Sequence, residues 1–209
     1  KNFKEQKELN KDDLLIIAGD FGFPWISIDN NEDNYWLDWF NDKNFTTLVI
    51  DGNHENFTEL YKYPNVDFMG MKTHQLRDSV YHIKRGEITN INGKNFLFMG
   101  GAISIDKAYR VKGKSWWEEE EPSYEEWQKA FSNINKADIV ISHDAPFSVS
   151  NYMIGRINQN SVNKNLDELY NRSKTIEKWY FGHHHVDRTI SYGKTKFICL
   201  YNEIEEIKF

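Results

Sequence analysis

Four short polar segments carry side chains that could bind a metal ion. They are Gly19-Asp20-Phe21-Gly22, Gly52-Asn53-His54-Glu55, Ser142-His143-Asp144-Ala145-Pro146 and Gly182-His183-His184-His185. Together they supply carboxylate, amide and imidazole groups. This mixture of oxygen and nitrogen donors suits Mn, Fe, Zn or a similar divalent ion, and does not suit a soft metal bound by thiolates.

Each segment alone also has an ordinary interpretation. A Gly-Asp or Gly-Asn pair after a strand is usually a turn, and a single histidine at a strand end is usually a hydrogen-bonded side chain. The last segment is more specific for metal binding, because alternate residues of an extended chain face the same way. We therefore expect His183 and His185 to share one side, with His184 facing away, and the ordered set of four segments indicates a metal site.

These segments must be positioned by regular elements, and the sequence predicts several. Short β-branched or aromatic runs predict central strands, covered on both faces, at residues 14–18, 47–50, 96–99 and 139–142. Polar ligand-binding residues of α/β sheets gather just beyond the carboxyl ends of strands. The segments above follow predicted strands, so we expect them to meet at one edge of a layered α/β domain.

Two helices and a hairpin complete the prediction. Aromatic residues at positions 35, 36, 39 and 40 recur at helical spacing, and Ser123 with Glu126 forms a capping box that opens a helix through about Ile134. The C-terminal pattern predicts a hairpin that turns near Gly193, and a further strand at residues 204–207.

Composition limits the classes of function. The 209 residues, 39% of them hydrophobic, predict a single domain over residues 1–209. A formal charge of -6 argues against extended nucleic acid as a partner. The lone cysteine, Cys199, has no second cysteine with which to form an internal disulfide, and this favours a cytoplasmic setting. The apolar runs are too short for a membrane-spanning helix.

The ordered motifs resemble those of the calcineurin-like metallophosphoesterase family from residue 13 to about residue 187. The resemblance implies a four-layer αββα sandwich in which mixed β-sheets are flanked by helices. It also implies two divalent metal ions, and a phosphomonoester or phosphodiester substrate attacked by a metal-bridging hydroxide. The stretch of residues 100–106, followed by Arg110, resembles a bacterial or phage-borne branch.

The resemblance also assigns roles to individual residues. Asp20 would bridge both metals, and His54 would assist the leaving group as the catalytic histidine. The remaining metal ligands would be Asn53, His143 and His183 on one metal and His185 on the other. Separately, the planar guanidinium of Arg110 could bind a substrate phosphate.

The sequence departs from the family at its beginning. Members start with a strand that carries an Asp-X-His pair, and none precedes Asp20. We therefore expect a truncated chain that lacks the first strand, in which residues 3–9 are the tail of the helix that follows it. Two alternatives stay open, namely a non-catalytic scaffold that binds a protein partner, and a mononuclear hydrolase with one metal on Asp20, Asn53, His143 and His183.

Three further acidic features are predicted from local pattern alone. The run at residues 118–121 is expected to be a solvated face, because four consecutive acids are usually exposed. Either Asp51 or Glu55 could tune the protonation of His54, although a surface or capping role is at least as common for such residues.

Overall fold

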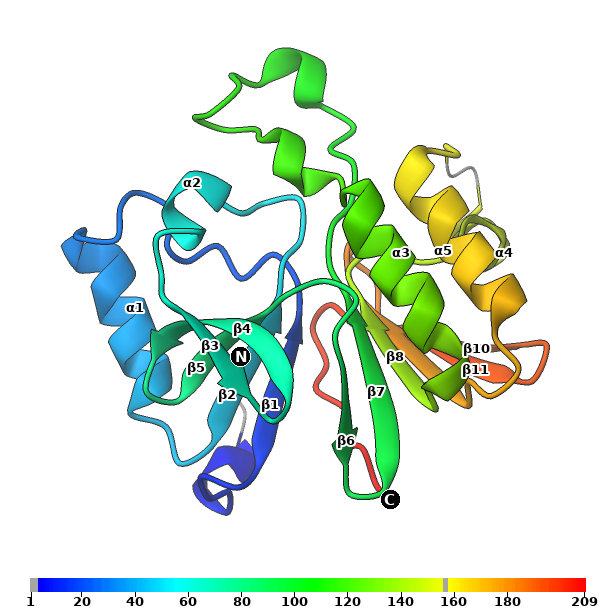
Figure 1. The fold of residues 1–209 in the computed structure, drawn as a ribbon, viewed down its shortest axis with the longest axis horizontal. Helices are drawn as coiled ribbons and strands as arrows, with labels where there is room; N and C mark the ends of the chain where they lie inside the picture. Colours follow the sequence, from blue (N-terminus) through cyan, green and yellow to red (C-terminus); the bar gives the residue numbers. More distant parts are fainter. Residues whose placement is uncertain (1–3, 156–157) are drawn as a thin grey trace.

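Two mixed β-sheets lie face to face in the computed structural model, which describes residues 4–155 and 158–209 (Figure 1). The first has the strand order β1-β2-β5-β4-β3 and the second β10-β11-β9-β8-β7-β6. The first sheet consists of β1 (Leu14–Ala18), β2 (Thr46–Ile50), β5 (Val80–Ile83), β4 (Met71–Arg77) and β3 (Asn65–Phe68). The second consists of β10 (Arg188–Tyr192), β11 (Thr195–Cys199), β9 (Lys178–Phe181), β8 (Ile139–Ser142), β7 (Lys94–Met99) and β6 (Ile88–Ile91).

Helices cover the outer face of each sheet. The first sheet carries α1 (Asn31–Asn41) and α2 (Phe57–Leu60), and the second carries α3 (Tyr124–Asn133), α4 (Phe147–Ile154) and α5 (Ser161–Arg172). Within the described residues, 3₁₀ turns lie at Lys4–Lys7, Lys107–Tyr109, Glu118–Glu120 and Ile134–Lys136. The predicted four-layer αββα sandwich is confirmed.

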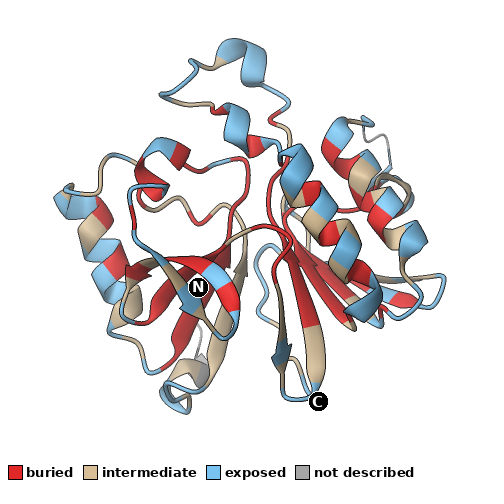
Figure 2. Ribbon diagram, in the orientation of Figure 1, coloured by how far each residue is buried: buried red, intermediate tan, exposed pale blue. Residues whose placement is uncertain are grey.

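Three apolar layers hold these elements together. Between the sheets, Ile50 and Ile83 of the first sheet pack with Phe98 and Ile141 of the second. Separate clusters join each sheet to its own helices. Figure 2 shows that the buried residues concentrate on the facing strands, while the helices turn exposed surfaces outward. This burial of apolar area is the main force that fixes the layers.

The parallel strands explain why the polar segments meet. β1, β2 and β5 are parallel neighbours in one sheet, and β7, β8, β9 and β11 are parallel neighbours in the other. Their carboxyl ends converge at one end of the sandwich, where the His143 Nδ1–H donates to the carbonyl oxygen of Ala18 at 2.7 Å. The loops that follow β1, β2, β8 and β9 therefore lie together.

Several local predictions are confirmed. The capping box opens α3, because the Ser123 hydroxyl accepts from the Glu126 N–H and the Ser123 N–H donates to the Glu126 carboxylate. The hairpin of β10 and β11 turns at Gly193, whose φ of 62° favours glycine. Among the described helices, none combines the length and apolar character required to cross a membrane.

Other local predictions are wrong. β1 is an edge strand of half-buried residues and not a central one, because within the described chain it pairs with β2 alone. Residues 204–207 form no strand; Asp187 accepts from the N–H groups of Tyr201, Asn202 and Glu203 and turns the backbone there. Within the predicted helix tail of residues 3–9, Lys4–Lys7 form one 3₁₀ turn, Phe3 lies outside the described residues, and the helix tail stays a prediction.

Candidate metal centre

Three predicted ligands converge where the loops after β1, β2 and β8 meet. The His143 Nε2 atom lies 3.3 Å from the Asp20 Oδ1 atom and 3.2 Å from the Asn53 Oδ1 atom. Because the His143 Nδ1–H donates to Ala18, Nε2 is the ring atom that faces the two oxygens, and its lone pair would bind a metal ion once its proton is lost. A carboxylate oxygen, an amide oxygen and an imidazole nitrogen thus point toward one another.

Two glycines permit this close approach. A Cβ atom built on Gly52 would lie 2.1 Å from the Asp20 Oδ1 atom and 2.8 Å from the His143 Nε2 atom. One built on Gly19, whose φ is +91°, would lie 2.1 Å from the His143 Nδ1 atom. The glycines that precede the motif residues therefore make room for the donors, in addition to turning the chain.

The histidine segment after β9 is not extended. His183 and His185 have φ angles of 61° and 52°, in the left-handed region, so the argument from alternating side chains was wrong. The His183 ring packs edge-on against the His143 ring with centroids 5.1 Å apart. His185 is exposed and its ring stacks on Tyr201 at 4.8 Å. The structure thus gathers Asp20, Asn53, His143 and His183, and places His185 against a different neighbour.

His184 packs against Phe181 and Asp144. Its Nε2 atom lies 3.1 Å from the Asp144 Oδ1 atom, and its ring meets Phe181 edge-on at 5.9 Å. The 3.1 Å separation is an electrostatic contact, because its angle does not meet the requirements of a hydrogen bond. The contact holds the histidine segment against the end of β8.

The predicted catalytic and phosphate-binding residues face each other. His54 is exposed, its backbone N–H donates to Asp20 at 3.0 Å, and its two ring nitrogens lie 3.3 and 3.4 Å from the Arg110 guanidinium. Asp106 fixes that guanidinium through a 2.9 Å contact with Arg110 Nε. The fold therefore brings a cationic group to the candidate catalytic histidine from a loop 56 residues away.

Neither expected acid tunes His54. Asp51 is buried and pairs with Arg85, and it accepts from His82 Nε2 at 3.1 Å. Glu55 is buried and accepts from the N–H groups of Phe21, Gly22 and Gly52 at 2.9, 3.0 and 3.4 Å. Both acids stabilise the loops that carry Asp20 and Asn53. The local sequence pattern did not reveal these contacts, because the partners of the two acids are distant in sequence.

The charges around the site favour a cation. Burial alone would raise the pKa of Asp20, but the facing His143 outweighs it and the pKa falls well below its usual range. Burial would lower the pKa of His143, yet Asp20 raises it to about 9. Burial and the adjacent His143 lower the pKa of His183 to about 4. Asp20 is therefore anionic and His183 neutral, and a metal cation would take the place of the proton that Asp20 holds on His143.

This donor set fits a divalent metal ion. Among the described residues, no three His, Cys, Asp or Glu side chains gather as a ready-made site; the convergence needs the amide of Asn53 as its third donor. Carboxylate, amide and neutral imidazole are ligands that Mn, Fe and Zn accept. The chemistry of the donors therefore agrees with the metal that the motifs predicted.

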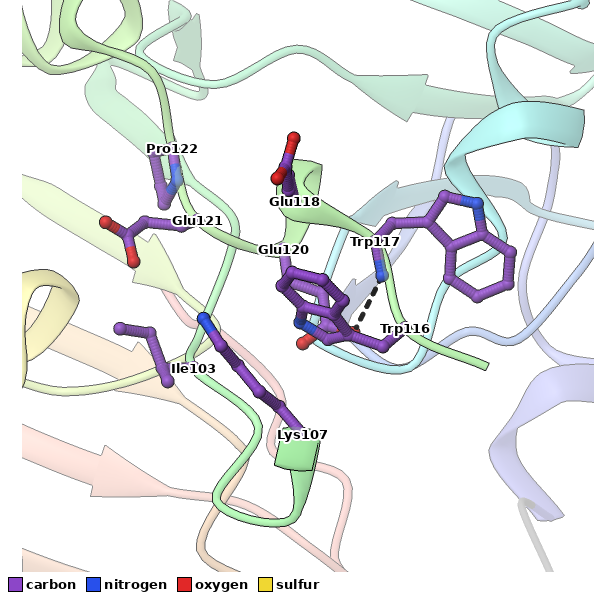
Figure 3. A pocket seen from close by; sticks show the side chains of 8 residues that line it. All are labelled: Ile103, Lys107, Trp116, Trp117, Glu118, Glu120, Glu121 and Pro122. Carbon is purple, nitrogen blue, oxygen red and sulfur yellow. Dashed lines mark hydrogen bonds between the residues drawn. The ribbon is translucent and has the colours of Figure 1, made fainter. Parts of the chain in front are cut away.

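The loop of residues 101–122 borders the site and contains a buried acid. A pocket of about 310 Å³ is lined by Ile103, Lys107, Trp116, Trp117, Glu118, Glu120, Glu121 and Pro122, and by none of the predicted ligands among the described residues (Figure 3). Glu118 and Glu121 point away from Glu120, which is only 2% exposed and meets the Trp117 N–H. The predicted solvated face is thus wrong for Glu120, because its side chain turns inward toward Ser104.

Comparisons with known proteins relate the chain to one family. The family model for calcineurin-like phosphoesterases matches residues 1–187. No curated protein matches the chain. The solved structure of GAP50, the anchor in the inner membrane complex of Plasmodium, is similar over 90% of this chain, with 11% sequence identity and a TM-score of 0.42. This chain spans 60% of that protein's length.

Proposed function

Because the chain belongs to the calcineurin-like phosphoesterase family, we propose that it hydrolyses phosphate esters at the convergence of Asp20, Asn53 and His143. The observation that carries the proposal is the approach of the Asn53 and Asp20 oxygens to the His143 Nε2 atom at 3.2 and 3.3 Å. These three residues, with His183 beside them, would hold a divalent metal ion. When bound, such an ion neutralises phosphoryl oxygens and lowers the pKa of water.

His54 and Arg110 would act on the substrate itself. The Arg110 guanidinium, held by Asp106, has donors in a planar fork that suits phosphate oxygens. The His54 ring lies within 3.4 Å of it, so a bound phosphate would contact both groups. Burial and Arg110 lower the pKa of His54, whereas the negative charge of a phosphate ester would favour the protonated ring. His54 would then donate its proton to the leaving oxygen.

The position of His185 favours a single-metal arrangement as the second candidate. The resemblance implies two metals, with His185 on the second, but this side chain stacks on Tyr201. Asp20, Asn53, His143 and His183 suffice for one metal. Binding of Mn²⁺ measured by calorimetry separates the cases: two ions per chain, with one lost in His185→Ala, support the dinuclear site, and one ion per chain that is insensitive to His185→Ala supports the mononuclear site.

Hydrolysis of an aryl phosphate monoester and an aryl phosphodiester tests the activity. We expect turnover that depends on Mn²⁺ and falls in Asp20→Asn and His54→Ala, with thermal denaturation confirming that both variants fold. Ser150→Ala is the matched control, because that residue is buried in α4 and lies outside the proposed donor set. Mn²⁺ binding without hydrolysis of either ester would favour the scaffold that binds a protein partner.

A further inference from the structure

Two buried polar side chains of the loop of residues 101–122 connect to Asn53: Ser104 contacts it, and Glu120 contacts Ser104. This loop joins β7 to α3 and rises above the two sheets at the end where the candidate metal centre lies (Figure 1). Ser104 is 4% exposed, Glu120 2% and Asn53 4%. The Asn53 Nδ2–H donates to Ser104 Oγ at 3.0 Å, and the Ser104 hydroxyl donates to Glu120 Oε2 at 2.6 Å. The three side chains therefore form one continuous hydrogen-bonded chain.

The chemistry of the three side chains determines which atom donates and which accepts in each of these hydrogen bonds. Both Glu120 oxygens accept, one from the Trp117 N–H and one from Ser104, so Glu120 takes the single proton of the Ser104 hydroxyl. The Ser104 oxygen can then only accept from Asn53, which selects the amide nitrogen as the end that faces it. The amide oxygen must point the other way, toward His143 Nε2 at 3.2 Å.

Orientation matters because the two ends of an asparagine side chain have nearly the same shape but opposite character. The amide oxygen can bind a metal ion, whereas the NH₂ group is a donor and cannot. We infer that Ser104 and Glu120 are positioning residues that turn the Asn53 amide oxygen toward the candidate metal centre. This inference rests on the proposed function, since it assigns the two residues a role in holding the metal's ligand.

Backbone contacts fix the two positioning residues in place. The Gly101 N–H donates to the Asp51 carbonyl at 3.0 Å, and the Ala102 N–H donates to the Glu120 carbonyl at 3.1 Å. The Trp117 Nε1–H donates to Thr58 Oγ1 at 2.9 Å. Because both ends of the loop are tied to the segments around Asn53, loss of the Ser104 hydroxyl leaves the Asn53 NH₂ group without its partner in a buried place. The amide is then free to reverse.

Mn²⁺ affinity measured by isothermal calorimetry tests the inference without relying on turnover. Ser104→Ala is expected to weaken Mn²⁺ binding by about 10- to 100-fold, the usual effect of removing a group that orients a metal ligand. Ser104→Thr keeps the hydroxyl and is expected to restore most of the affinity. Ser150→Ala is the matched control: Ser150 is 0% exposed and its hydroxyl donates to Pro146 within α4, so its loss lowers the melting temperature and leaves Mn²⁺ affinity unchanged.

The results of the Mn²⁺ binding measurements separate the positioning role of Ser104 from the proposed function. Wild-type protein that binds Mn²⁺, with Ser104→Ala within about threefold of it, would overturn the positioning role and leave the proposed function standing. Wild-type protein that binds no Mn²⁺ would overturn both. If Ser104→Ala does not fold, Glu120→Gln carries the same test, because it replaces one acceptor oxygen with a donor of equal size and lets the hydrogen-bonded chain reverse. Unchanged affinity in that variant would also overturn the inference.

Discussion

Replacing Gly52 by alanine is expected to weaken Mn²⁺ binding by at least about 100-fold, equivalent to about 2.8 kcal/mol. The added Cβ would lie 2.1 Å from the Asp20 Oδ1 atom and 2.8 Å from the His143 Nε2 atom. Non-bonded heavy atoms settle at about 3.5 Å or more, so the Asp20 carboxylate would retreat by more than about 1 Å. Metal ligands tolerate displacements of only about 0.2 Å, and the donor is therefore lost.

The same substitution should also cost stability. Forcing a methyl group into a packed site typically destabilises a protein by about 1–3 kcal/mol, which urea denaturation resolves. The backbone of Gly52 lies outside the positive φ range, so alanine adds no conformational strain and the cost comes from the contacts alone.

Gly70→Ala is the matched control. Its φ is +76° and a Cβ there would meet nothing within 4 Å, so alanine costs about 1–2 kcal/mol of backbone strain and touches no donor. We expect both variants to be destabilised and only Gly52→Ala to lose Mn²⁺ affinity, as measured by calorimetry. Wild-type affinity and wild-type stability in Gly52→Ala would refute the steric reasoning.

Substitutions at four other residues are expected to have separable effects. His54→Ala should lower kcat for an aryl phosphate by about 10²- to 10³-fold and leave Mn²⁺ affinity unchanged in calorimetry, because its ring contacts Arg110 and none of the donors. Arg110→Ala should raise KM at least about tenfold, with Arg110→Lys intermediate; an unchanged KM would remove Arg110 from the substrate site. Glu55→Gln should lower the free energy of unfolding by about 1–3 kcal/mol in urea, since it replaces one of the two oxygens that accept backbone N–H groups. Burial and the adjacent His82 lower the pKa of His74 from its ordinary 6.5 to about 3, so the folded state binds fewer protons than the unfolded chain below pH 6.5. Stability should thus fall by about 2 kcal/mol between pH 6.5 and pH 5, and His74→Gln should show a correspondingly smaller loss in urea denaturation; equal losses would contradict the assignment.

The sequence alone predicted the layers and the edge at which the site lies. β8 agrees with the predicted run at residues 139–142, and the capping box at Ser123 opens α3 as expected. These features depend on side chains close together in sequence, through strand periodicity and local hydrogen bonds, so a pattern can reveal them. The motifs also placed Asp20, Asn53 and His143 after strands, and parallel strands necessarily bring such residues to a common edge.

Contacts between distant segments decided the rest. The sequence could not tell which acid of residues 118–121 is buried, because that depends on Ser104, 16 residues away. Likewise, the left-handed φ of His185 and its stacking on Tyr201 separate it from His183, although spacing suggested a shared side.

Residue types and their order therefore determined the chemistry available to this protein, because donor character belongs to each side chain. Which donors face one another was decided only by the tertiary structure. The 3.2 Å approach of Asn53 to His143 joins residues 90 positions apart, and it depends on a loop that directs the Asn53 amide through Ser104 and Glu120. Packing between sheets and loops sets such distances, and no local pattern records them.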